Sequence, residues 1–111
     1  MSAEFRAEVE ATLEGGETED LLGVIIDLAL AAEDARWAED CLLGLAAHPD
    51  TDVRGNALVA FAQLADRFGG LHRERVEPVL VAALDDVKAY VRGQATAALE
   101  ELGWAIDDGA P

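Results

Sequence analysis

Apolar residues recur along the chain at intervals of three and four, which is the period of an amphipathic α-helix. The clearest example follows Asp52, where six apolar positions fall on one face of a helical wheel: Val53, Ala57, Ala60, Phe61, Leu64 and Phe68. The sequence has no run of alternating β-branched residues bounded by turn residues, which is the pattern of a strand. The chain is therefore predicted to be all-α.

Capping residues, glycines and prolines divide this pattern into six helices. The predicted ranges are 3–13, 19–32, 34–47, 52–68, 73–84 and 88–106. Thr18, Asp34 and Asp50 are placed to cap the second, third and fourth helices. Gly69 is placed to end the fourth. The second helix is apolar on nearly every side, so it is predicted to lie buried between neighbours.

The sequence also repeats itself. VRGNA at 53–57 returns as VRGQA at 91–95, 38 residues later, and flanking apolar positions correspond as well. Self-similarity at a fixed period of this length is typical of stacked helical repeats. We predict a single domain, 1–111, of three antiparallel helix pairs at 1–33, 34–70 and 71–111. The first pair is degenerate, because it does not keep the register of the other two.

Charge changes the picture of possible partners. The 111 residues carry 23 acidic and 8 basic side chains, for a net charge of −15. Residues 1–34 alone hold ten acidic side chains and one basic. Such a field repels phosphate backbones, which argues against nucleic acid, and it would speed the encounter with a basic protein. The acidity could equally serve solubility alone.

The remaining composition bears on location. The single cysteine, Cys41, has no internal disulfide partner, which favours a reducing cytoplasmic setting. The longest apolar stretch, 21–32, is interrupted by Asp27 and is too short to span a bilayer. No basic region followed by an apolar core opens the chain, so no secretion signal is predicted. We therefore expect a soluble cytoplasmic protein that makes no contact with a membrane.

The segments DVRGNA at 52–57 and YVRGQA at 90–95, each preceded by an acidic turn, resemble HEAT repeats of the short bacterial type. In that family a turn aspartate precedes a Val-Arg pair that opens the second helix of each repeat. The resemblance covers 34–106 and implies a right-handed α-solenoid. The string from Trp37 through His48-Pro49-Asp50 to YVRGQA is also similar to small HEAT-like proteins encoded beside bacterial polymorphic toxins. That similarity implies an immunity protein.

The two repeated arginines, Arg54 and Arg92, occupy equivalent wheel positions within an otherwise apolar arc. They could clamp an anion or a substrate. The alternative is an inter-repeat ladder with turn carboxylates, because partly buried charges need partners. Recurrence at the repeat period favours the ladder, which would contain Asp50, Asp52, Arg54, Asp86 and Arg92. Gly55 and Gly93, both inside helices, predict close approach of neighbouring helices.

The face left over on the fourth and sixth helices is the predicted partner-binding surface. It carries Asn56, Val59, Gln63, Arg67, Gln94, Glu101 and Trp104. Its amides could simply be solvated. Trp104 is either a binding anchor or a side chain folded over the C-terminal core, and the sequence leaves both open.

Chemistry of other kinds finds little support in the sequence. His48 and His72 fall in turns without a second ligand at metal-binding spacing, and Cys41 lies on an apolar helix face. No nucleophile–base arrangement can be argued. We expect a non-enzymatic protein-binding module without metal or cofactor, an immunity protein that occludes a basic toxin domain. The alternatives are a HEAT-like lyase or enzyme-assembly factor, and a structural homo-oligomer formed through the second helix. A monomer and a homodimer are both compatible with the sequence.

Overall fold

A computed structural model describes residues 3–104, and all regular structure in that range is helical. The six helices are α1 (Ala3–Gly15), α2 (Thr18–Ala31), α3 (Ala35–Leu45), α4 (Thr51–Phe68), α5 (Arg73–Ala83) and α6 (Ala89–Leu102). No strand occurs among these residues. The predicted all-α class is confirmed.

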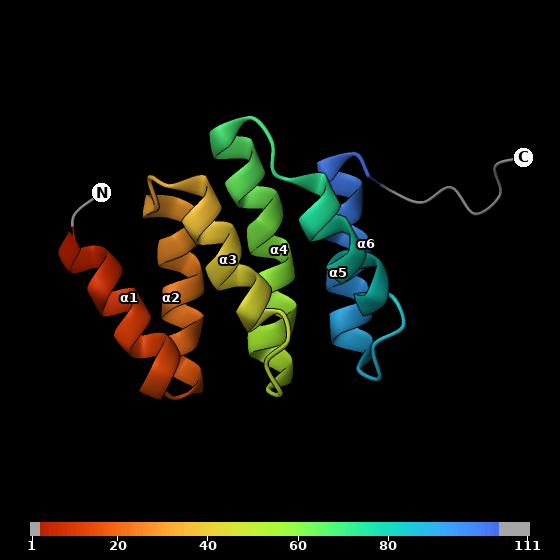
Figure 1. Ribbon diagram of the computed structural model, residues 1–111. Helices are drawn as coiled ribbons and strands as arrows, with labels where there is room; N and C mark the ends of the chain where they lie inside the picture. Colours follow the sequence, from red (N-terminus) through yellow and green to blue (C-terminus); the bar gives the residue numbers. More distant parts are fainter. Residues whose placement is uncertain (1–2, 105–111) are drawn as a thin grey trace, which may run out of the picture.

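The helices form two rows (Figure 1). In one row α4 lies between α2 and α6 and packs against both, while α1, α3 and α5 form the other row. Each helix of the α1, α3 and α5 row packs on the helix that follows it in the chain, so α1 pairs with α2, α3 with α4 and α5 with α6. The molecule is a slab of 50 × 29 × 17 Å, and its shortest dimension fits two helix layers whose axes are about 8–10 Å apart.

Two of the predicted helix starts, those of α3 and α4, are explained by their side-chain caps. Asp34 Oδ1 accepts a hydrogen bond from the Trp37 amide at 3.0 Å. Asp50 Oδ1 accepts from the amides of Asp52 and Val53 at 2.9 and 3.1 Å. These bonds satisfy amides that have no partner within the helix, so both predicted caps are confirmed.

The predictions for the cap of α2 and for the end of α6 are wrong, and the other helix ends lie within two residues of the predicted ones. Glu17 occupies the cap position of α2, and Thr18 is the first helical residue. The Glu17 amide is satisfied instead by Asp20 Oδ2 at 3.1 Å. The sixth helix stops at Leu102 and not at Ile106, because Gly103 adopts a left-handed conformation with φ 74° and ends the helix. Ile106 lies outside the described residues.

The core lies between the two rows, and α4 contributes most of it. Phe61, Leu64 and Val53 are completely buried, and Val91 and Leu99 of α6 are buried at the repeat-equivalent positions of Val53 and Phe61. Burying a large aliphatic or aromatic side chain stabilises the fold by about 1.5–3 kcal/mol. The repeated sequence therefore produces a repeated core.

The second helix departs from the prediction that it is enclosed. Leu21, Ile25 and Leu28 are buried, but Ile26 and Leu30 are 58% and 68% exposed. The neighbours of α2 are α1, α3 and α4, and together they leave one side of it uncovered. Within residues 3–104, no helix combines the length and apolar character needed to cross a membrane.

The two repeated glycines differ in their surroundings. A Cβ on Gly55 would lie 2.5 Å from Tyr90 Cε2, so α4 and α6 approach closely there, as predicted. A Cβ on Gly93 would meet no atom within 4 Å. The prediction of close approach is wrong for Gly93, because no described element packs on that side of α6.

Candidate protein-binding surface

The junction between α4 and the turn before α6 is held by an arginine–carboxylate pair. Arg54 Nε and Nη2 donate to the two carboxylate oxygens of Asp86 at 2.8 and 2.9 Å. The third guanidinium nitrogen, Nη1, donates to the carbonyl oxygens of His48 and Pro49. Both charged side chains are about 15% exposed. The paired geometry matches the fork of the guanidinium to the carboxylate, so Arg54 is used in packing between repeats.

Asp86 is the centre of this junction. Its Oδ1 also accepts from the Lys88 amide at 2.9 Å, and the Arg54 and Lys88 hydrogen bonds lower the pKa of Asp86 to about 2. Arg92 Nη1 donates to the Asp86 carbonyl at 2.7 Å. This bond reproduces, one repeat later, the bond from Arg54 to His48. Both arginines therefore fix the turn that precedes their own helix.

The preceding junction uses a neutral partner. Thr18 Oγ1 donates to Asp50 Oδ2 at 3.2 Å, which joins the start of α2 to the cap of α4. The pKa of Asp50 is lowered, chiefly by the hydrogen bond from the Val53 amide. Asp52 is exposed and uses its backbone carbonyl to accept from Asn56. The structure therefore places four of the five predicted ladder residues in the junctions and leaves the Asp52 side chain outside them.

The α4 part of the predicted binding surface forms a row along that helix. Asn56 and Val59 are half-buried, and Gln63 is exposed. The Asn56 side chain donates to the Asp52 carbonyl of its own helix. Arg67 Nη1 donates to the Ala29 carbonyl at 3.2 Å. That bond places the end of this row beside α2.

The α6 part of the predicted surface is divided. Gln94 lies against Gly55, and its Nε2 donates to the hydroxyl of Tyr90 at 3.2 Å, so this amide belongs to the α4–α6 junction. Glu101 is exposed. Gln94, the residue of VRGQA that replaces Asn56 of VRGNA, is therefore engaged in packing contacts within the fold.

Trp104 is folded partly over the C-terminal core, which is one of the two alternatives left by the sequence. Its ring packs partly buried against the core, with the Arg73 guanidinium carbon 5.3 Å from the ring centroid. It also lines, with Glu101, a hollow of about 330 Å³ near the ends of α4 and α6. The packed orientation is present, and one part of the ring remains at the surface.

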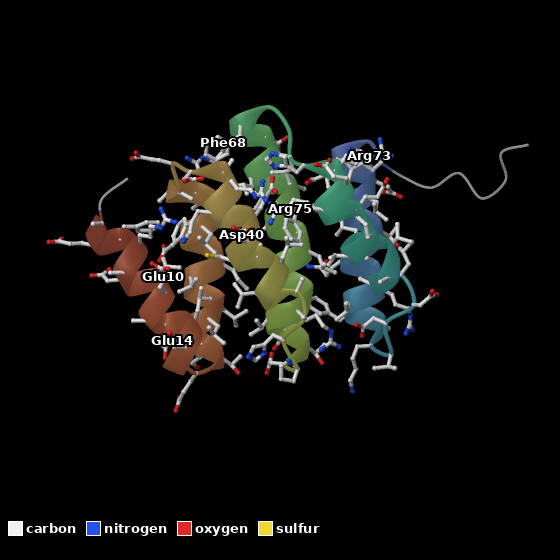
Figure 2. The ribbon with its side chains drawn as sticks, in the orientation of Figure 1. Glu10, Glu14, Asp40, Phe68, Arg73 and Arg75 are labelled. Carbon is white, nitrogen blue, oxygen red and sulfur yellow. The ribbon has the colours of Figure 1, made fainter. Side chains whose placement is uncertain are left out.

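A buried carboxylate that the sequence analysis did not single out connects α3 to α5. Glu39 is completely buried and accepts from Arg75 Nη1 at 2.7 Å and from the His72 amide at 3.0 Å. Arg75 Nη2 also donates to Asp40 Oδ1, and both residues are labelled in Figure 2. His72 Nδ1 lies 3.0 Å from Glu39 Oε2, so His72 does more than end a turn. The signal in the sequence was a glutamate between Ala38 and Leu42, two positions on an apolar helix face.

The exposed aliphatic residues of α2 were also missed as surface residues. Ile26 and Leu30 are one turn apart on the uncovered side of the helix. The signal was present in the sequence, because a helix that is apolar on every side needs neighbours on every side. The sequence could not show that the fold supplies such neighbours on only some sides of α2.

These positions define an all-helical, two-layer protein in which a few charged side chains, among them Arg54, Asp86 and Glu39, join neighbouring helices and turns. Within residues 3–104, no group of three or more His, Cys, Asp or Glu side chains is placed to hold a metal ion.

A comparison with solved structures agrees with this fold. The chain is similar to a chain in the crystal structure of a CDI complex from Cupriavidus taiwanensis LMG 19424. The TM-score is 0.77 at 27% sequence identity, over 87% of this chain and 86% of the other. No protein-family model matches the sequence, and no curated protein matches it.

Proposed function

We propose that this chain is a non-enzymatic immunity protein that binds a toxin domain in the cytoplasm and blocks its active site. The similarity to a chain of a CDI complex carries the proposal, because it extends over 87% of the chain. CDI denotes contact-dependent inhibition, in which toxins are held in check by immunity proteins. A shared fold of that extent fits a shared role in toxin neutralisation.

We further infer that the two rows form a right-handed solenoid of HEAT-like repeats. Support comes from the equivalent bonds of Arg54 to the His48 carbonyl and Arg92 to the Asp86 carbonyl, both spanning six residues. Contacts that recur at the repeat period are typical of stacked repeats.

The charge of the chain indicates the chemistry of the toxin domain. A net charge of −15, concentrated in residues 1–34, attracts a basic surface over a distance set by the ionic strength. Complementary charge raises the association rate more than it changes the final affinity. The toxin domain is therefore basic on the side that meets this protein.

The test uses the toxin domain encoded by the gene adjacent to that of this chain. Co-expression is expected to abolish its toxicity, and the purified proteins should associate at a rate that falls about tenfold or more from low to high salt. Protection with a salt-independent association rate would contradict the electrostatic mechanism. Absence of both protection and binding would overturn the proposed function.

A further inference from the structure

One side of α2 carries exposed aliphatic residues that nothing within residues 3–104 covers. Glu19, Gly23, Ile26 and Leu30 recur at intervals of three and four and share this side of the helix. All four are exposed. The opposite side of α2 is buried in the core through Leu28. Single exposed apolar residues are common on protein surfaces, whereas exposed apolar residues that lie next to one another indicate an interaction site.

An acidic groove runs beside this stripe, between α1 and α2. It has a volume of about 320 Å³, and its apolar lining includes Val9 and Val24. Its carboxylates are those of Glu8, Glu19, Asp20 and Asp27. Neither lysine nor arginine is among the residues that line it. An acidic wall over an apolar floor suits the aliphatic stem and charged end of a lysine or arginine side chain.

The groove and the stripe form one continuous surface, because Glu19 and Gly23 belong to both. On the other side of the stripe, the Arg67 guanidinium bonds the Ala29 carbonyl, next to Leu30. The row of Val59 and Gln63 on α4 therefore continues the surface away from the groove. Part of the sequence-predicted binding surface lies at its edge.

We infer that this α1–α2 surface is where the toxin domain docks, with basic side chains in the groove and apolar side chains over Ile26 and Leu30. The inference rests on the proposed function and identifies the surface that performs it. Charge complementarity selects the occupant. A second copy of this chain, related by a two-fold axis through this surface, would bring its own carboxylates toward those of the groove, which is unfavourable.

Two pairs of variants test the inference against the toxin domain encoded by the adjacent gene. Ile26→Gln with Leu30→Gln removes the apolar contact without adding charge, and it is expected to weaken binding by at least about tenfold, mainly through faster dissociation. Val87→Gln is the matched control, since Val87 is 86% exposed and lies in the turn before α6. That control should bind like the unmodified protein.

The second pair of variants separates the effect of the groove carboxylates from the effect of the net charge. Glu8→Gln with Asp27→Asn is expected to slow association about threefold or more and to reduce its salt dependence. Glu74→Gln with Glu100→Gln changes the net charge by the same amount at exposed positions outside the groove. Equal effects of the two double variants would show that only total charge matters and would overturn the groove assignment.

The remaining outcomes distinguish the two proposals. If the unmodified chain binds the toxin domain and the Ile26→Gln, Leu30→Gln variant binds it equally well, the docking surface is wrong while the proposed function stands. If the unmodified chain does not bind the toxin domain, the proposed function fails, and so does the proposal that the toxin domain occupies the α1–α2 surface. If sedimentation shows a dimer that this variant separates into monomers, the stripe is covered by a second copy and the inference is overturned.

Discussion

The ring of Tyr90 lies directly against Gly55, so that a Cβ at this position would be 2.5 Å from the ring carbon Cε2. The glycine sits inside α4, where it costs about 1 kcal/mol relative to alanine. The ring occupies the space that a side chain would need. This contact brings α6 against α4 and explains why a helix-weakening residue stands in the second turn of α4.

Gly93, the repeat equivalent of Gly55, is a control for this contact because no ring lies against it. Gly93→Ala should raise the free energy of unfolding by up to about 1 kcal/mol, because nothing lies within 4 Å of the added methyl group. Gly55→Ala should lower it, since displacement of the Tyr90 ring outweighs the gain in helix propensity. Urea denaturation measures both. In a Tyr90→Ala background, Gly55→Ala should become stabilising, and a loss of stability there would contradict the role of the ring.

The Arg54–Asp86 pair gives the protein a defined acid response. The pKa of Asp86 is lowered to about 2 in the folded protein, whereas in the unfolded chain it has its ordinary value of about 4. As the pH falls, Asp86 of the unfolded chain therefore takes up a proton before Asp86 of the folded protein does. The stabilisation is complete above about pH 4 and is lost as the pH falls toward 2. Denaturation midpoints across this range should decline less steeply for Asp86→Asn. An identical decline in the variant would show that other carboxylates dominate acid unfolding.

The buried Glu39 carboxylate depends on Arg75 for its counter-charge. Arg75→Met keeps most of the side-chain volume but leaves Glu39 buried without a cation, and we expect a loss of about 3 kcal/mol. Adding Glu39→Gln to this variant should restore part of the loss, because a neutral amide costs less to bury than a carboxylate. Chemical denaturation of the three proteins provides the measurement. Wild-type stability in the single variant would contradict this account.

Cys41 should react slowly as long as the protein is folded. Burial, together with the nearby carboxylates of Glu10 and Asp40, raises the pKa of Cys41 from 9.0 to about 11. The thiolate is the reacting species, so iodoacetamide should modify the folded protein about 100-fold more slowly than the unfolded chain at pH 8. Mass spectrometry follows the modification. Equal rates in the folded and unfolded protein would show that the thiol is freely accessible.

Periodicity predicted the six helices well because each helix needs a continuous apolar side and a capped start. Asp34 and Asp50 begin their helices as predicted, since their short carboxylates reach amides that are close in sequence. The end of α6 was missed because Gly103 is compatible both with a helical position and with a helix end. Only its left-handed conformation decides between them.

The candidate surface was harder to predict than the fold. Wheel positions show which side of a helix is polar, but they do not show which neighbours that helix has. Ile26 and Leu30 look like core residues on a wheel and are exposed because α2 lacks a neighbour on that side. Gln94 looks like a surface residue and instead lies at the α4–α6 junction, because its position was judged without Tyr90.

The acidic groove has two walls that differ in how firmly they are held. The α2 wall is anchored through Leu21, Ile25 and Leu28, whereas Val9 is the fully buried residue of α1. Local opening is easiest where the fewest apolar contacts are lost, so amide hydrogens of α1 should exchange before those of α2. The α1 wall of the groove can therefore open at a smaller cost in buried apolar contacts than the α2 wall. Adaptability in width is built into the same surface that supplies the charge.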